Sequence, residues 1–170
     1  RGAAHRDIAR VRLDGTGRTR LSETPGQHEA IFNPAFTHYL DTWSDAHTPH
    51  QVRLHRADGR PVRVVDANDV PALREYRLPK WEFLQVATRD GFPMEAALIK
   101  PPGFDPARKY PVYQHTYAGP HAPQVRNGWF AASLFLQLVA ENGVVVFVCD
   151  NRSASGKGLV SAATAYKRMG

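Results

Sequence analysis

Apolar residues in the first part of the chain, from Asp7 to about Asn68, come in short bursts that alternate with polar positions. Asp-Gly steps at Asp14-Gly15 and Asp58-Gly59 interrupt this part, and such steps are typical of tight hairpin turns. The pattern predicts four short strands in one antiparallel meander. Such a sheet is small and needs a neighbour to cover its faces. The bursts lie at Ile31–Phe32, Tyr39–Leu40, Val52–Leu54 and Val62–Val65.

The pattern changes after about Pro71. A long stretch with apolar positions on both sides of Asp90-Gly91 predicts a β-hairpin. The segment 110–117 predicts another strand, which Gly119-Pro120 ends. We therefore expect the second part of the chain to begin with three strands.

A helix and a further strand follow. Apolar residues recur at helical spacing from Trp129 to Val139, and Asn142-Gly143 gives a stop signal. The apolar run 144–148 is typical of a strand buried on both faces. Strand, helix and strand with short connections predict a parallel crossover unit, so the second part is of the α/β class. The expected domains are residues 1–71, an antiparallel four-stranded unit, and residues 72–170, an α/β unit.

Composition is that of a globular protein, with 42% hydrophobic and 22% charged residues. No apolar run approaches the roughly 18 residues of a membrane span. The net charge is +6, and six arginines fall within residues 1–20, but that stretch contains no Phe, Tyr or Trp to stack on bases. Dispersed surface arginine is therefore the preferred interpretation over nucleic-acid binding.

Common catalytic motifs are missing from the sequence. There is no Gly-x-Ser-x-Gly. The segment 151–158, NRSASGKG, lacks the leading glycine of a phosphate loop, and we expect a solvent-exposed turn there. His47 and His50 flank a Thr-Pro step that favours extended backbone over a helical ligand pair, so no metal site is expected. The single cysteine, Cys149, lies in an apolar run and is interpreted as a buried, inert thiol.

The segment 115–123, HTYAGPHAP, places Tyr117 at the carboxyl end of a predicted strand. In α/β folds ligand sites lie at such ends, and a phenol there can donate a hydrogen bond. The pattern alone favours a packed tyrosine with its hydroxyl at the surface over a catalytic donor. Both interpretations remain open on the residues alone.

An ordered series of short motifs resembles the prolyl oligopeptidase family of serine peptidases, most closely its dipeptidyl-peptidase IV branch. The resemblance implies that residues 72–170 form the start of an α/β-hydrolase domain, whose strand order begins 1-2-4-3-5. It also implies that residues 1–71 form the last blade of a β-propeller, whose repeats are four-stranded meanders. The motifs are Asp90-Gly91, Pro101-Pro102-Gly103-Phe104-Asp105, Tyr110-Pro111, Tyr117-Ala118-Gly119-Pro120 and Asp150-Asn151-Arg152-Ser153.

The resemblance assigns one catalytic role within this chain. The family's tyrosine in this motif donates its hydroxyl to the oxyanion of the tetrahedral intermediate, and Tyr117 occupies that position. The family's Ser-Asp-His triad is not in this chain, because its serine follows on an elbow beyond the matched region. Asp150 and Arg152 match positions expected to be structural, with Arg152 anchoring the loop after the last strand. Ser153-Ala154 replaces the family's glycine in that loop.

The family also implies what the protein acts on. Its members are serine peptidases, and the dipeptidyl branch releases dipeptides from peptide N-termini, often after proline. We expect no cofactor and no metal. We expect this chain alone to be inactive, with the remainder of the same enzyme as its partner. Bacterial-type relatives favour a periplasmic or otherwise extracytoplasmic location. His115 and His121 receive no role, and the alternative function is a non-catalytic β plus α/β interaction module.

The expected strand order leaves the strand 110–117 as a sheet edge in this chain. Unpaired, apolar edges pair with other chains. We therefore predict self-association, as a homodimer or a domain-swapped assembly, or retention of another piece of the same enzyme. Size-exclusion chromatography with light scattering measures this, and a monodisperse 18.9 kDa species would contradict it.

Overall fold

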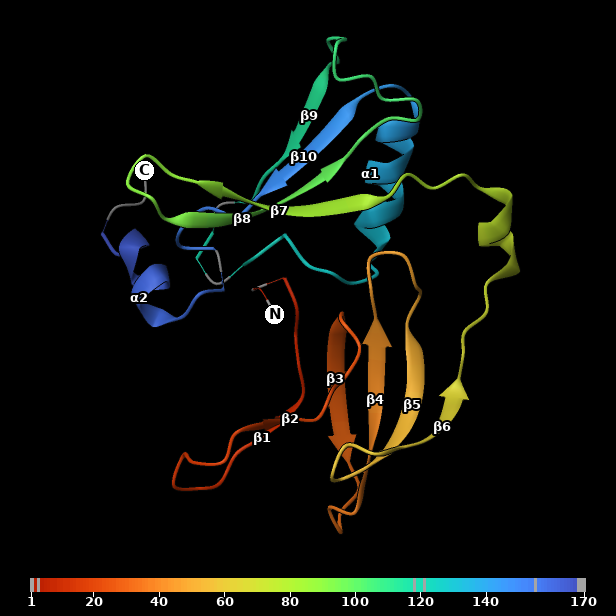
Figure 1. The fold of residues 1–170 in the computed structure, drawn as a ribbon, viewed down its shortest axis with the longest axis vertical. Coiled ribbons are helices and arrows are strands. Elements are labelled where there is room, and N and C mark those ends of the chain that lie inside the picture. The colour runs from red at the N-terminus through yellow and green to blue at the C-terminus, as the bar shows by residue number, and fades with distance from the viewer. Residues whose placement is uncertain (1, 3, 118, 121, 155, 168–170) are drawn as a thin grey trace. The chain divides into compact units, whose positions relative to one another are not determined.

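The computed structural model describes residues 2, 4–117, 119–120, 122–154 and 156–167 and divides into two compact units (Figure 1). The first unit contains Arg1–Glu75 and Asn127–Trp129, and the second contains Tyr76–Arg126 and Phe130–Gly170. The expected boundary at residue 71 falls on the first residue of the 3₁₀ helix η1 (Pro71–Glu75), inside the first unit.

The first unit is built on an antiparallel meander. Its strands β3 (Gln27–Phe32), β4 (His38–Ser44), β5 (Gln51–Arg56) and β6 (Pro61–Asp66) pair in chain order (Figure 1). The four-stranded meander predicted from alternation is thus confirmed. A separate two-stranded ribbon, β1 (Ala9–Arg10) with β2 (Thr19–Arg20), precedes it.

The core of this unit lies on one face of the meander. Tyr39 is 1% exposed and packs with Ile8 and Leu21 from the preceding segment. The Tyr39 ring also lies 4.9 Å from that of Phe32, centroid to centroid. On the other face, Ile31 and its cross-strand neighbour Leu40 are 65% and 38% exposed. Alternate side chains point to opposite faces of a sheet, so the preceding segment covers only one of the two.

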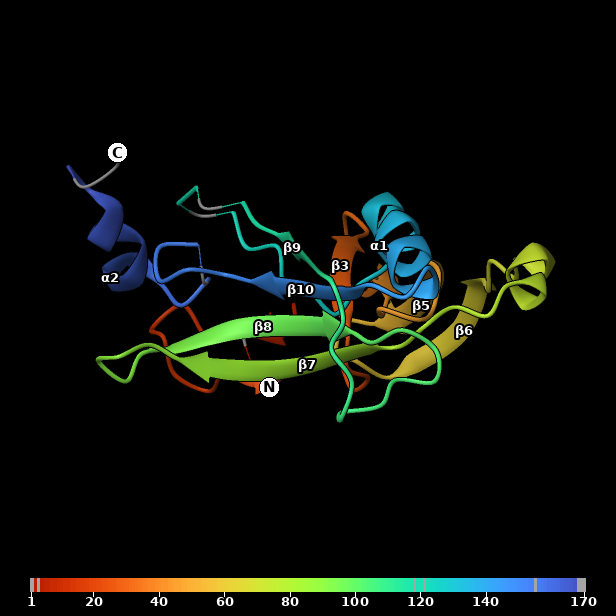
Figure 2. The same cartoon turned by 90° about the horizontal axis from the view of Figure 1, so that it is seen from above.

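The second unit is built on a four-stranded mixed sheet. Figure 2 shows its order, β7 (Trp81–Ala87), β8 (Pro93–Ile99), β10 (Val145–Cys149) and β9 (Val112–His115). The pairs β7–β8 and β8–β10 are antiparallel, and β10–β9 is parallel. The predicted parallel crossover therefore exists as one strand pair, whereas most strand pairs in the described residues are antiparallel.

Helix α1 (Ala131–Glu141) connects the two parallel strands and contacts β10 and β8 (Figure 1). It ends where predicted, because Gly143 has a φ of +85° and its N–H donates to the Ala140 carbonyl at 3.0 Å. A short helix α2 (Leu159–Ala162) and a 3₁₀ turn η2 (Ala163–Ala165) follow β10. No helix within the described ranges is long and apolar enough to cross a bilayer.

Burial along β10 corrects one prediction. Val146 and Val148 are buried, but Val145, Phe147 and Cys149 are only half-buried. The apolar run was expected to be buried on both faces. The two faces are covered unequally here, and a uniformly apolar run carries no signal of which positions are exposed. Cys149 is a free thiol whose pKa is raised, first by burial and then by the charge of Asp150.

Gly26 offers a sharp test of the first unit, because it precedes β3 at a φ of +147°. A Cβ there would lie 2.4 Å from the Ser44 carbonyl oxygen and 2.5 Å from Trp43 Nε1. Gly26→Ala should therefore lower the free energy of unfolding by about 3 kcal/mol or more, since β4 must move. Urea denaturation measures the change.

Gly15→Ala is the matched control. Gly15 has a φ of +82°, and a Cβ added there would meet no atom within 4 Å, so only the left-handed backbone is penalised, by about 1 kcal/mol. Equal losses for the two variants would contradict the steric argument.

Candidate active site at the carboxyl ends of β9 and β10

Tyr117 follows the last residue of β9 by two positions. Since β9 and β10 run parallel, with His115 opposite Val148, their carboxyl ends lie at the same edge of the sheet. Tyr117 is 58% exposed, so this residue is not part of the core. An exposed phenol at the end of a parallel strand is well placed to donate a hydrogen bond to a bound ligand.

Gly119 gives the Tyr117 ring its space. A Cβ at Gly119 would lie 2.8 Å from Tyr117 Cε1 and 3.4 Å from its hydroxyl oxygen. The spacing of tyrosine and glycine in this motif therefore has a steric reason: a side chain at Gly119 would displace the ring. Ala118 and His121 lie outside the described residues, and His115 is a half-buried residue of β9.

Asp150 follows β10 directly and is 1% exposed. One of its carboxylate oxygens accepts the backbone N–H of Gln124 at 2.7 Å, and the other accepts that of Val125 at 3.0 Å. Burial raises the pKa of Asp150, against the opposing effect of these two hydrogen bonds and of Arg126. The carboxylate thus links the end of β10 to the loop that leaves β9.

Two basic side chains tie the segment after β10 to the β7–β8 hairpin. Arg152 forms an ion pair with Asp90, and its guanidinium lies 4.6 Å from the centre of the Phe92 ring. Lys157 Nζ lies 2.8 Å from Glu95 Oε1 and 5.3 Å from the same ring. These contacts agree with the expected anchoring role of Arg152.

The turn after β10 was expected to be solvent-exposed, but part of it is buried. Ser153 is 8% exposed and Ala154 is fully buried. The side-chain oxygen of Asn151 accepts hydrogen bonds from the Ala154 N–H and the Ser153 hydroxyl, which closes the turn inward. Ser155, in the same segment, lies outside the described residues.

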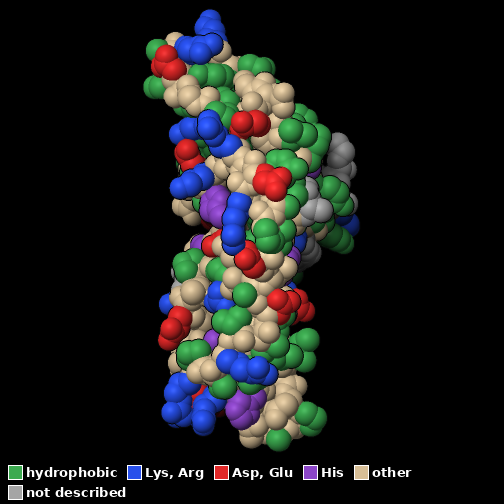
Figure 3. Space-filling view, turned by 90° about the vertical axis from the view of Figure 1, so that its right-hand side faces the viewer, with side chains coloured by type: hydrophobic (Ala, Val, Ile, Leu, Met, Phe, Trp, Pro, Cys, Tyr) green, Lys and Arg blue, Asp and Glu red, His purple; other side chains and the backbone are tan. Residues whose placement is uncertain are grey.

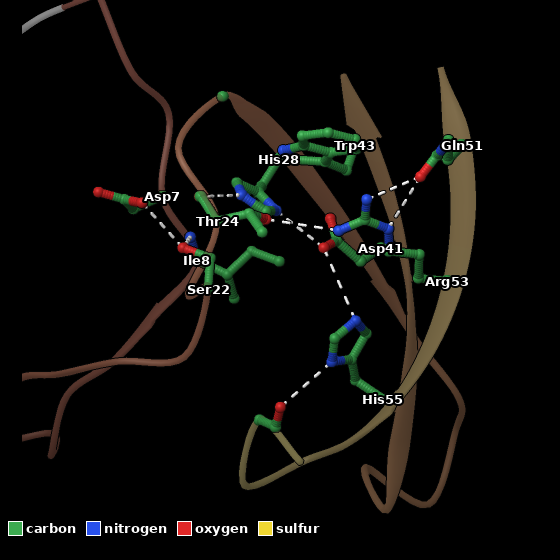
Figure 4. A network of polar contacts seen from close by, with 12 residues as sticks. Asp7, Ile8, Ser22, Thr24, His28, Asp41, Trp43, Gln51, Arg53 and His55 are labelled. Carbon is green, nitrogen blue, oxygen red and sulfur yellow. Dashed lines mark hydrogen bonds and ion pairs between the residues drawn. The ribbon is translucent and has the colours of Figure 1, made fainter. Parts of the chain in front are cut away.

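A buried polar cluster on the first unit has no counterpart among the sequence predictions (Figure 4). His28 Nδ1 lies 2.8 Å from Asp41 Oδ2, and His28 Nε2 lies 2.9 Å from the Thr24 carbonyl oxygen. His55 Nε2 lies 3.9 Å from the same Asp41 oxygen. Arg53, also on this face, lies 3.9 Å from the Trp43 ring centre. The strand register, which places these residues on one face, was the signal that could have found them.

The cluster borders a pocket of about 400 Å³ lined by residues that include Asp41, Arg53 and His55. Across the described part of the chain, no three His, Cys, Asp or Glu side chains are grouped to hold a metal ion. On the face drawn in Figure 3, Lys and Arg side chains are dispersed among Asp and Glu side chains. The carboxyl edge of β9 and β10 is the candidate active site, because Tyr117, the residue that the resemblance singled out, lies there.

Comparison with known proteins gives a consistent answer, although no protein-family profile matches the chain. Dipeptidyl peptidase 4 of Arthroderma otae is 28% identical over 148 residues, which cover 84% of this chain and 19% of that protein. A protein of Emericella nidulans described as a probable dipeptidyl-aminopeptidase B is 32% identical over 164 residues, which cover 93% of this chain and 18% of that protein. The chain thus spans about a fifth of the length of these relatives.

A solved structure shares the fold. The crystal structure of Porphyromonas gingivalis dipeptidyl peptidase 4 superimposes with a TM-score of 0.86 at 29% identity, over 96% of this chain and 23% of that one. Together with the sequence relatives, it shows that the chain belongs to the prolyl oligopeptidase family. Within that family it belongs to the dipeptidyl-peptidase IV group, as the ordered motifs from Asp90 to Ser153 indicated.

The ion pair of Arg152 with Asp90, which we call the hairpin tether, leads to a prediction about the pKa of Asp90. Hydrogen bonding from the Thr88 hydroxyl, followed by the contact with Arg152, lowers the pKa of Asp90 to about 2. Because the folded-state pKa is depressed, the tether stabilises the fold above the ordinary aspartate pKa and is lost as the pH falls toward 2. Carboxyl-detected NMR titration should place the Asp90 midpoint near pH 2.

Two variants separate the causes. Thr88→Val should raise the Asp90 pKa more than Arg152→Met, because the hydroxyl hydrogen bond is the larger influence. An Asp90 that titrates at its ordinary value in the unsubstituted chain would show that neither contact forms in solution.

Proposed function

We propose that this chain is part of a serine-type dipeptidyl peptidase in which the Tyr117 hydroxyl forms one side of the oxyanion hole. The observation that carries the proposal is the exposed Tyr117 phenol at the carboxyl end of β9, within a chain similar to named dipeptidyl peptidases. The substrate class is peptides with a free N-terminus, cleaved after the second residue, often a proline.

The architecture supports the same proposal. Residues 1–71 serve as the last propeller blade and residues 72–170 as the start of an α/β-hydrolase domain. The sheet order β7-β8-β10-β9 is 1-2-4-3 in chain order, which is how the hydrolase sheet begins. In that sheet the next strand, beside β9, carries the nucleophile.

The chemistry explains why a tyrosine is needed. When a serine oxygen attacks the scissile carbonyl carbon, the π electrons of the carbonyl move to its oxygen, which becomes negatively charged. A fixed O–H donor near that oxygen stabilises the charge more than it stabilises the neutral carbonyl, so it lowers the barrier. Tyr117 supplies the donor, and the backbone N–H that follows the nucleophile supplies a second one.

The triad itself comes from other residues of the enzyme. This chain contains no Gly-x-Ser-x-Gly, so we propose that it hydrolyses nothing by itself. A proline-containing dipeptide chromogenic substrate tests this directly. Enzyme-like turnover by the 170-residue chain would contradict the assignment. We call the proposed enzyme that includes this chain and the triad the longer protein. The alternative function, a non-catalytic interaction module, predicts no turnover by the longer protein either.

Tyr117→Phe in the longer protein tests the role of the phenol. Loss of one oxyanion donor should lower kcat by about 10²- to 10³-fold while KM changes little, because the lost hydrogen bond strengthens only in the transition state. Steady-state kinetics with the same chromogenic substrate measures both constants.

Tyr113→Phe is the matched control. Tyr113 lies within β9, opposite Val146, and its ring meets that of Phe135 edge-on at 6.2 Å, so its hydroxyl is not at the carboxyl end of the strand. This variant should keep its kcat. Equal kcat values for the Tyr117→Phe variant and the unsubstituted enzyme would remove Tyr117 from the mechanism.

A further inference from the structure

Asp150 is an unusual residue because it is an ionisable side chain that is almost completely buried. A buried carboxylate destabilises a fold unless its oxygens are well hydrogen-bonded. Here both oxygens accept backbone N–H groups, and both of those groups belong to one short segment, Gln124-Val125. The buried carboxylate therefore binds a single backbone segment, Gln124-Val125.

The segment Gln124-Val125 is the C-terminal end of the loop that contains Tyr117. The loop leaves the sheet at His115, which pairs with Val148 of β10. It returns at Gln124, whose N–H binds Asp150. His115 and Gln124 are thus held by residues two positions apart, Val148 in β10 and Asp150 directly after it.

The loop also passes close to the segment after β10. A Cβ added at Gly156 would meet Pro123 Cγ at 3.8 Å, so the two residues are near neighbours. Val125, beside the fastened end, is 2% exposed and fixed in the core. Within the loop, Gly119 leaves room for the Tyr117 ring.

We infer that Asp150 is a positioning residue: its carboxylate clamps the returning end of the loop and thereby fixes the Tyr117 phenol at the carboxyl edge of the sheet. The inference rests on the proposed role of Tyr117. It gives the carboxylate a role, since each of the two N–H groups donates to a different oxygen of Asp150. An asparagine offers one oxygen and one NH₂ group, which would oppose the second N–H.

The first experiment measures the clamp without any activity. In the 170-residue chain, amide hydrogen exchange at Gln124 and Val125 is followed by NMR. Asp150→Asn should speed exchange at one or both of these amides by about tenfold or more, while the strand amides of β8 and β10 stay protected. Unchanged exchange at Gln124 and Val125 would overturn the inference.

Asp105→Asn is the matched control. Asp105 also accepts a backbone N–H, from Ala107 at 2.9 Å, but it lies in the loop before β9, at the opposite end of that strand. This variant should leave the two amides and the kinetics unchanged. If Asp150→Asn does not fold, scalar couplings across the two N–H to carboxylate bonds of the unsubstituted chain decide the matter, and their absence refutes the clamp.

The second experiment connects the clamp to Tyr117. In the longer protein, Asp150→Asn should lower kcat by between about tenfold and a hundredfold, with little change in KM, because the donor is misplaced. In the Tyr117→Phe background the same substitution should lower kcat by less than about twofold, since the donor is already gone. Full multiplication of the two effects would show a merely structural role and overturn the inference.

The two hypotheses fail in different ways. If Tyr117→Phe leaves kcat unchanged, the proposed function of the phenol fails, whatever the exchange rates show. If Tyr117→Phe lowers kcat but Asp150→Asn alters neither exchange nor kcat, only the positioning role of Asp150 fails.

Discussion

The parallel pairing of β9 with β10 is the constraint on which the candidate site of this chain depends. It brings the carboxyl ends of two strands, separated in sequence by a helix, to one edge of the sheet. Tyr117 follows one strand and Asp150 follows the other. Without this strand pair, nothing would bring the exposed tyrosine and the buried carboxylate to the same edge of the sheet.

Much of the framework could be predicted from the sequence because it depends on local patterns. Alternation of apolar and polar positions predicts the meander of β3–β6, and helical spacing with Asn142-Gly143 predicts α1 and its end. The mixed character of the second sheet was harder to see. Each strand of the sheet has a local signal, but the direction in which β8 pairs with β10 is decided by packing over a long sequence separation.

The candidate site was only partly visible for the same reason. The sequence placed Tyr117 after a strand, and only the resemblance gave it a role, which stays a proposal. The partners of Asp150 lie about 25 residues earlier in the chain, and no spacing in the sequence announces a carboxylate that binds two backbone N–H groups. The His28–Asp41–His55 cluster likewise appears only once the strand register is known.

Among the contacts between the segment after β10 and the β7–β8 hairpin, two ion pairs differ in their exposure to water. The ion pair of Arg152 with Asp90 is between partners that are 37% and 63% exposed, whereas the pair of Lys157 with Glu95 is 21% and 10% exposed. Dissolved ions screen exposed charges far more than shielded ones. At high salt concentration the ion pair of Arg152 with Asp90 would therefore weaken first, while the pair of Lys157 with Glu95 would still hold the segment beside β8.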